Sequence, residues 1–344
     1  MKPVRVLVVD DSATMRGLIA ATLAREGAIE IVGEAADPYE ARDAIKALNP
    51  DVMTLDVEMP KMDGLDFLDK VMRLRPLPVV MVSAHTGKGA DAAIRALELG
   101  AIDCVSKPSI DCPNAFDALA PAILAAKSAR IGDRGATSAV QRGGASRSYQ
   151  WDGKKIVAMG ASTGCVEALI PIMARYPANC PPTLVAVHMP AKFTRSFARR
   201  LDSLTEARVC EAENGAPLAP GHVYVAPGGG PHLEAAKHGR PICVLREGPR
   251  INGHAPSVDA LFLSVAKNFG VDAVGAILTG MGRDGASGLL AMRNAGARTL
   301  GQNEATSVIY GMPRVAFECG AVEEQASVHD LANRILTLTS LNRC

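Results

Sequence analysis

A serine, a histidine and an aspartate in the second half of the chain have the side-chain types that carry out nucleophilic acyl transfer. Ser162 lies within the sequence G-A-S-T-G of residues 160–164, between an apolar run and an expected helix. His188 and Asp284 each follow an apolar run of their own. A hydroxyl is a poor nucleophile at neutral pH unless a base takes its proton, and a carboxylate can fix the tautomer of that base. The pattern predicts Ser162 as the nucleophile, His188 as the base and Asp284 as its orienting acid.

Each of these residues also has an ordinary structural interpretation. A G-x-S-x-G sequence by itself is typical of a tight turn, an aspartate before glycine is commonly a turn residue, and a lone histidine is more often packed than catalytic. Two features favour a catalytic role instead. The glycines allow a sharp strand-to-helix turn, and the N–H groups at the helix N-terminus can bind negative charge. N–H groups around Ser162 and in residues 280–282 are candidates for holding an oxyanion.

The other histidines are weaker candidates for a catalytic role. Seven histidines are present in all. His254 lies in a glycine-rich loop where it could line the cleft. Four others are expected at the surface or in turns: His222, His232, His238 and His329.

Five polar side chains follow successive apolar runs in the first half of the chain: Asp10, Asp11, Asp56, Ser83 and Lys107. Because the carboxyl ends of parallel strands meet at one edge of a sheet, we expect them in one crevice. Three carboxylates there need a cation, and hard oxygen ligands open to phosphate suit Mg²⁺. Asp56 would then accept a phosphoryl group, balanced by Mg²⁺, Lys107 and Ser83. For any single residue a solvent-facing strand end is the simpler interpretation, but not for all five together.

The apolar runs alternate with helical patterns, which predicts an α/β protein with two doubly wound parallel sheets. Expected strands of the first half are residues 4–9, 30–34, 51–56, 79–82 and 104–106. Those of the second half are residues 155–159, 183–187, 273–279 and 298–302, the last as the closing strand. Residues 233–236 and 242–246 predict an inserted β-hairpin that turns at 237–240, and a helix is expected to start at residues 256–262.

Between these halves the composition becomes rich in glycine, serine, threonine and arginine without a hydrophobic period. This predicts a flexible linker over residues 126–152, between domains of residues 1–125 and 153–344. Its arginines are expected to keep it solvated rather than to dock a partner. Trp151, the single tryptophan, is expected to anchor the start of the second domain.

The bulk composition excludes several function classes. A formal net charge of +1 gives no electrostatic footprint for nucleic acid. Eight cysteines without C-x-x-C spacing indicate neither a zinc site nor a disulfide framework. No apolar run approaches the roughly 20 residues that cross a bilayer, and no signal peptide precedes the first strand. We therefore expect a cytoplasmic protein that does not insert into membranes, and a monomer.

The first half resembles the response-regulator receiver family over roughly residues 1–125. The resemblance rests on V-V-D-D-S at residues 8–12, L-D-V-E-M-P-K-M-D-G at 55–64, S-A at 83–84 and K-P at 107–108. It implies a flavodoxin-like fold in which Asp56 takes a phosphoryl group from a sensor histidine kinase. One departure is Cys104, which stands where receivers often carry an aromatic switch residue.

The second half resembles the catalytic domain of the chemotaxis protein-glutamate methylesterases over roughly residues 153–344. The matching segments are G-A-S-T-G at 160–164, H-M-P at 188–190, P-S-V-D-A-L-F at 256–262, T-G-M-G-R-D-G-A at 279–286 and S-V-I-Y-G-M-P at 307–313. The resemblance implies a Rossmann-like esterase domain in which Ser162, His188 and Asp284 form the triad and Met281 supplies an oxyanion N–H. Cys165 departs from the usual glycine and could narrow the approach of substrate.

Together these features predict a phosphorylation-regulated hydrolase that acts on glutamate methyl esters of chemoreceptors, and on receptor glutamines, in sensory adaptation. The resemblance implies no cofactor in the esterase domain. Two alternatives belong to other classes. One is an interaction module that has lost catalysis, against which the complete triad argues. The other is a DNA-binding regulator, for which the second half offers no basic recognition helix.

Overall fold

The computed structural model describes residues 2–83, 87–109, 113–130 and 149–341. It divides into two compact units, Met1–Arg134 and Gly135–Cys344, which are considered separately. Most of the expected linker, residues 131–148, lies outside the described residues. Within the described ranges, no helix combines the length and the apolar character that a bilayer crossing requires.

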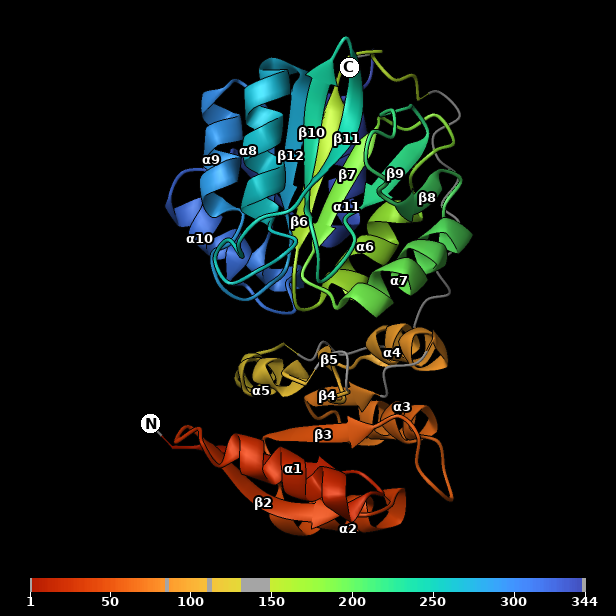
Figure 1. Ribbon diagram of the computed structural model, residues 1–344, viewed down its shortest axis with the longest axis vertical. Helices are drawn as coiled ribbons and strands as arrows, with labels where there is room; N and C mark the ends of the chain where they lie inside the picture. Colours follow the sequence, from red (N-terminus) through yellow and green to blue (C-terminus); the bar gives the residue numbers. More distant parts are fainter. Residues whose placement is uncertain (1, 84–86, 110–112, 131–148, 342–344) are drawn as a thin grey trace. The chain divides into compact units, whose positions relative to one another are not determined.

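The first unit is a parallel five-stranded sheet in the order β2-β1-β3-β4-β5, with helices between successive strands (Figure 1). Its strands are β1 (Val4–Val9), β2 (Ile29–Ala35), β3 (Val52–Asp56), β4 (Val79–Ser83) and β5 (Asp103–Ser106). Its helices are α1 (Ala13–Leu23), α2 (Pro38–Leu48), α3 (Gly64–Leu74), α4 (Gly87–Leu99), the 3-10 turn Ala115–Ala118 and α5 (Leu119–Lys127). This is the doubly wound order expected from the sequence.

Local sequence explains where these helices begin. The Ser12 hydroxyl accepts a hydrogen bond from Met15 N at 3.3 Å and caps α1. Asp37 and Asp63 cap α2 and α3 in the same way. These short polar side chains satisfy N–H groups that the first helical turn leaves without partners. β1, β3 and β4 are almost wholly buried, whereas the edge strand β2 is mostly half-buried.

The second unit is a seven-stranded sheet in the order β14-β13-β12-β6-β7-β9-β8, with every neighbouring pair parallel. Its strands are β6 (Ile156–Ala161), β7 (Thr183–Val187), β8 (Arg208–Glu211), β9 (His222–Val225), β12 (Ala273–Ile277), β13 (Arg298–Gln302) and β14 (Glu324–Ala326). Its helices are α6 (Cys165–Met173), α7 (Ala191–Leu204), α8 (Val258–Phe269), α9 (Ala286–Asn294), α10 (Met312–Glu318) and α11 (Val328–Leu338), with 3-10 turns at Gly270–Asp272 and Glu304–Thr306.

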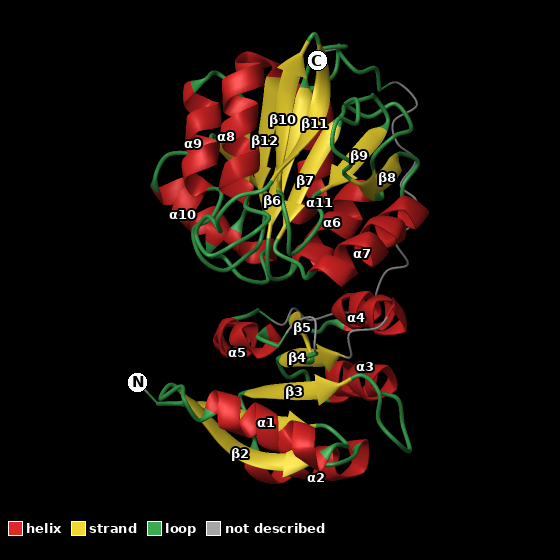
Figure 2. Cartoon of the chain, in the orientation of Figure 1, coloured by secondary structure: helices red, strands yellow, loops and turns green. Residues whose placement is uncertain are grey.

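Helices cover both faces of this sheet (Figure 2). On one face lie α8, α9 and the antiparallel hairpin of β10 (His232–His238) and β11 (Arg240–Arg246), which confirms the expected insertion. On the other face α6 packs against α7 and α11. Apolar side chains of the hairpin, α8, α9 and the sheet form one continuous core. That core fixes the loops at the carboxyl edge of the central strands.

Two expectations for this unit are wrong. Arg298–Gln302 does not close the sheet, because β14 pairs beyond it in parallel. β14 has only three residues, Glu-Gln-Ala, and carries no apolar run that would mark a strand. His232 is neither at the surface nor in a turn, since it begins β10 with 4% of its surface exposed.

Candidate functional site

Three adjacent strands bring the predicted triad together at one edge of the second sheet. Ser162 directly follows β6, His188 directly follows β7, and Asp284 lies in the loop after β12. β6 is central and pairs with both of the other strands in parallel. The chain runs outward from β6 through β7 and later returns to β12, so the site lies where the direction of winding reverses. Crevices at such switch points are the usual ligand sites of open α/β sheets.

The turn that carries Ser162 is held by its backbone. Ser162 N donates to Thr279 O at 3.0 Å, and Cys165 N donates to Ser162 O at 2.9 Å. Gly164 adopts a φ of +83°, in the left-handed region that favours glycine. A Cβ on Gly280 would lie 2.7 Å from the Ser162 Cβ, so this position needs glycine for a different reason, close approach. The Cys165 side chain is buried.

Asp284 is a buried carboxylate surrounded by donors, with 1% of its surface exposed. Its Oδ1 accepts from the Ser257 hydroxyl at 2.8 Å, Asn252 Nδ2 at 3.0 Å and Asp259 N at 3.2 Å. Its Oδ2 contacts His188 Nε2 at 2.8 Å and accepts from Val258 N at 2.7 Å. Burial by itself would raise the pKa of Asp284, but the bonds from His188, Asn252 and Val258 hold it well below its usual range.

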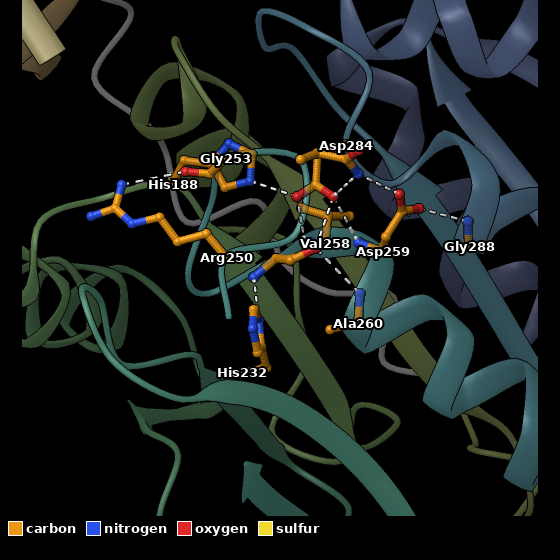
Figure 3. A network of polar contacts seen from close by, with 11 residues as sticks. His188, His232, Arg250, Gly253, Val258, Asp259, Ala260, Asp284 and Gly288 are labelled. Atoms are coloured by element: carbon orange, nitrogen blue, oxygen red, sulfur yellow. Dashed lines mark hydrogen bonds and ion pairs between the residues drawn. The ribbon is translucent and has the colours of Figure 1, made fainter. Parts of the chain in front are cut away.

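The contact with Asp284 determines which nitrogen of His188 can act as a base. Because the Asp284 carboxylate is ionised and only accepts, His188 Nε2 must carry a proton. In the neutral ring the lone pair then lies on Nδ1, which is buried and makes no hydrogen bond to any described residue. Ser162 Oγ makes no hydrogen bond to His188 in the structure, and catalytic contacts often tighten only when substrate binds. Figure 3 shows the network around the carboxylate.

Several residues of this network escaped the sequence analysis. His232 Nδ1 accepts from Ser257 N at 3.1 Å and its Nε2 contacts Pro249 O at 3.0 Å, so it fixes the start of α8 from the hairpin. Asn252 bridges Asp259 and Asp284. These contacts join residues 7 to 32 positions apart in the chain. The Asn252-Gly253 dipeptide was the available signal, because it is the strongest short-range marker of a tight turn.

Two of the backbone N–H groups expected to bind an oxyanion near Ser162 already donate to carbonyl oxygens of the protein. Gly280 N donates to Ile309 O at 3.1 Å, and Ser162 N is taken by Thr279 O. Neither N–H is therefore available to a substrate oxygen. Met281, the next residue of the loop, is 44% exposed. Thr279 ties this loop to the serine turn through a hydroxyl bond to Thr163 O at 3.0 Å.

In the first unit, the three carboxylates predicted to bind a cation lie close together. Ligand oxygens of Asp10, Asp11 and Asp56 lie within 4.8 Å of one another. Lys107 Nζ lies 2.8 Å from Asp10 Oδ2 and 2.7 Å from Asp56 Oδ2. Burial, with the neighbouring Asp10 charge, raises the pKa of Asp56 although Lys107 opposes this; the pKa of Lys107 is itself raised by its two carboxylate partners, against the effect of burial. These all-oxygen ligands fit a hard divalent cation.

An open pocket of about 550 Å³ lies beside these carboxylates, large enough for a phosphoryl group. It is lined by Asp11, Asp56, Glu58, Met59, Pro60, Asp63 and Lys107. Ser83 is buried at the end of β4, and its hydroxyl donates to Gly89 O at 3.3 Å. Cys104 is buried in β5, and burial raises the pKa of its thiol, which stays neutral.

Comparison with known proteins supports the family resemblance of each half of the chain. Residues 157–335 match the family model "CheB methylesterase", and residues 6–114 match "Response regulator receiver domain". The chain is 56% identical to protein-glutamate methylesterase/protein-glutamine glutaminase 1 of Caulobacter vibrioides, over 100% of both chains. It is 54% identical to the protein-glutamate methylesterase/protein-glutamine glutaminase of Agrobacterium fabrum, over 98% of this chain and 97% of that one. The Thermotoga maritima CheB methylesterase catalytic domain covers 54% of this chain and 98% of its own, at 36% identity and a TM-score of 0.52.

Proposed function

We propose, from the premise that this chain belongs to the CheB methylesterase family, that Ser162, His188 and Asp284 carry out its hydrolysis. The protein is a protein-glutamate methylesterase and protein-glutamine glutaminase of chemotaxis adaptation, regulated by phosphorylation. The observation that supports the residue assignment is the His188–Asp284 contact of 2.8 Å at the strand end beside Ser162.

The reaction follows from the protonation states. Ser162 Oγ attacks the ester carbonyl and gives its proton to His188 Nδ1, while Asp284 stabilises the imidazolium that forms. Collapse of the tetrahedral intermediate breaks the bond to the methoxy group, which leaves as methanol with the proton from Nδ1. Water then attacks the acyl-serine and gives a proton to His188 Nδ1; the bond between the acyl carbon and Ser162 Oγ breaks, Oγ takes the proton from Nδ1, and the glutamate is released. With a glutamine substrate the same steps release ammonia. The N–H of Met281 is our candidate donor to the oxyanion.

In the receiver unit, Asp56 is the proposed phosphoryl acceptor. Asp10, Asp11 and Asp56 would hold Mg²⁺, which neutralises charge on the transferred group. Lys107, which now pairs with Asp10 and Asp56, would form an ion pair with the oxygens of the new phosphoryl group. Ser83 is proposed to follow, giving up its contact with Gly89. The phosphodonor would be a chemotaxis sensor histidine kinase.

The proposed substrates are methylated glutamates and selected glutamines on chemoreceptor signalling helices. The cytoplasmic location and the monomeric state expected from the sequence remain predictions. Incubation of the purified protein with labelled methylated receptor, with and without a phosphodonor, tests the assignment. Methanol release that rises with the phosphodonor supports it. Release that survives Ser162→Ala at the wild-type rate contradicts the triad, and phosphorylation that persists in Asp56→Ala contradicts the acceptor.

Metal binding is tested apart from turnover. Chelation of divalent ions should abolish phosphorylation of Asp56, and added Mg²⁺ should restore it. Asp11→Ala should raise the Mg²⁺ concentration needed, because one ligand oxygen is lost. Phosphorylation that is indifferent to chelation would contradict the proposed site.

A further inference from the structure

The loop before α8 contains a tight two-residue turn, and residues of this turn contact His188 and Asp284. Ile251 N donates to His254 O at 3.0 Å and His254 N donates to Ile251 O at 2.9 Å. The two central residues, Asn252 and Gly253, have φ values of +52° and +83°. Two successive left-handed residues define the tight hairpin turn for which Asn-Gly is the preferred sequence. The turn therefore fixes the spacing of Asn252 and His254 by its own backbone.

Asn252 uses its side-chain amide to join two buried carboxylates. Its Nδ2 donates to Asp259 Oδ2 at 2.7 Å and to Asp284 Oδ1 at 3.0 Å. Burial, with the nearby Asp284 charge, raises the pKa of Asp259, and the bonds from Gly288 N and Asn252 oppose this rise. Asp259 is fixed in turn by the bond from Gly288 N. The amide thus supplies one hydrogen bond to each of the two carboxylates.

His254 lies flat against the ring of His188. The ring centroids are 3.6 Å apart and the planes are inclined by 4°. His188 is therefore held at one edge by Asp284 and across one face by His254. An edge contact alone leaves an imidazole free to swing about its Cα–Cβ and Cβ–Cγ bonds, whereas a stacked face opposes that motion. Burial and the adjacent His188 lower the pKa of His254 to about 4, so it adds no second positive charge near neutral pH.

We infer that Asn252 and His254 are positioning residues for the reaction, and that their turn clamps the base and its acid together. Asn252 acts on the acid through Asp284, and His254 acts on the base through His188. Their effect is to keep Nδ1 directed at the serine while the ring gains and loses a proton. Placement errors near 1 Å can cost about 100-fold in rate, so a loose base would be slow even with the triad complete. This inference rests on the proposed function of the triad.

The first experiment compares His254→Ala with His254→Phe in the full-length protein, using labelled methylated receptor. His254→Ala should lower kcat by about 10- to 100-fold with little change in KM, because the ring face is lost while substrate contacts remain. His254→Phe supplies a flat ring without a titratable group and should recover most of kcat. His329→Ala, at an exposed histidine of α11, is the matched control and should behave as wild type.

A second readout does not depend on turnover. Nitrogen-15 spectra of the imidazoles report the tautomer and the order of His188. Wild type and His254→Phe should show one Nε2-protonated form, and His254→Ala a mixture. A wild-type kcat and a single tautomer in His254→Ala would overturn the inference, and so would a loss that His254→Phe fails to recover. Should His254→Ala not fold, the phenylalanine variant decides: a kcat more than 10-fold below wild type overturns it.

Asn252 is tested with its own control. Asn252→Ala should lower kcat, whereas Asn252→Asp should lower it further and shift the pH–rate profile, because a third carboxylate faces Asp259 and Asp284. Asn294→Ala, at the exposed end of α9, should have no effect. An Asn252→Asp enzyme with wild-type kcat and pH profile would overturn this half of the inference. Failure of the triad assignment would show separately, as turnover that survives Ser162→Ala.

Discussion

His188 Nε2 lies 2.8 Å from Asp284 Oδ2, so the carboxylate binds the ring nitrogen farther from the backbone, and Nδ1 makes no hydrogen bond to a described residue. The familiar serine-protease triad uses the two nitrogens the other way round. Both arrangements work chemically, since a neutral imidazole has one N–H and one lone pair. Nδ1 is bonded to Cγ but lies off the Cβ–Cγ axis, so rotation about that bond moves Nδ1 and redirects its lone pair. Asp284 and His254 both oppose that rotation.

Loss of the nucleophile should separate the two activities of the chain. Ser162→Ala should lower methanol release by at least about 10³-fold, because members of a triad act as a unit. Phosphorylation of Asp56 should be unchanged, since its ligands all lie in the other unit. Ser203→Ala, at an exposed serine of α7, is the control. Methanol release near the wild-type rate would place the active site elsewhere.

Asp284→Asn should be far more harmful than its shape suggests. An amide group supplies one acceptor oxygen and one NH₂ group, so the NH₂ would face either Val258 N or the Ser257 hydroxyl, both of which now donate to a carboxylate oxygen. His188 would also lose the anion that fixes its tautomer. We expect kcat to fall by about 10⁴-fold, as for the corresponding change in a serine protease, with a lower free energy of unfolding. The kinetics and urea unfolding of the variant check both effects, and a variant within tenfold of wild type would contradict them.

Gly280→Ala tests the close approach to the serine. A Cβ there would lie 2.7 Å from the Ser162 Cβ and 2.4 Å from Met312 Sδ. Met312 is flexible and can move aside, whereas the Ser162 turn is tied to Thr279 and cannot yield as easily, so the clash should strain that turn and misplace Ser162. We expect kcat to fall by up to about 100-fold and stability by about 1–3 kcal/mol. Gly230→Ala is the control, because its nearest neighbour would be Gly228 O at 3.9 Å. Unchanged kcat in Gly280→Ala would show that the turn has more room than the structure indicates.

Cys104 tests how the receiver transmits phosphorylation. Without an aromatic ring at this position, Ser83 and its neighbourhood must carry the signal. Cys104 is buried and its thiol is neutral, so Cys104→Ala should leave the ratio of rates with and without phosphodonor nearly unchanged. Lys107→Ala should bring that ratio down to about one, because it removes the cation that pairs with Asp56. Loss of the response in a folded Cys104→Ala protein would show that the thiol takes part.

The sequence was sufficient to predict the residues that follow parallel strands. Ser162 and His188 lie where a buried run stops, and a parallel sheet brings such ends together whatever the loops do. It was insufficient for the residues that hold them. His232 reaches Ser257 across 25 positions, and no local pattern distinguishes it from a surface histidine at a strand start. Asn252 was readable as a turn, but its contacts with Asp259 and Asp284 depend on how α8 packs on the sheet.

The depressed pKa of His254 predicts a pH dependence of stability with a definite sign. An unfolded histidine titrates near 6.5, whereas burial and His188 lower the pKa of His254 to about 4. Between these values the unfolded chain binds a proton that the folded chain refuses, so stability falls as the pH is lowered through this window. The charged or titratable groups that influence His254 are His188, Asp284 and Arg250. The depressed pKa of Asp284 acts in a separate window, below its usual value of 3.8.

His254→Phe removes this one proton and keeps the stacked ring. Urea unfolding of the catalytic unit, followed in the intact protein between pH 7 and pH 4, should therefore show a smaller loss of stability in the variant than in wild type. The difference should begin near pH 6.5, grow with a slope of at most one proton and level off near pH 4. His329→Phe, at an exposed histidine, should follow the wild-type curve. Parallel curves for wild type and His254→Phe would mean that His254 takes up a proton in the folded protein, and a charged ring would then lie against the base during catalysis.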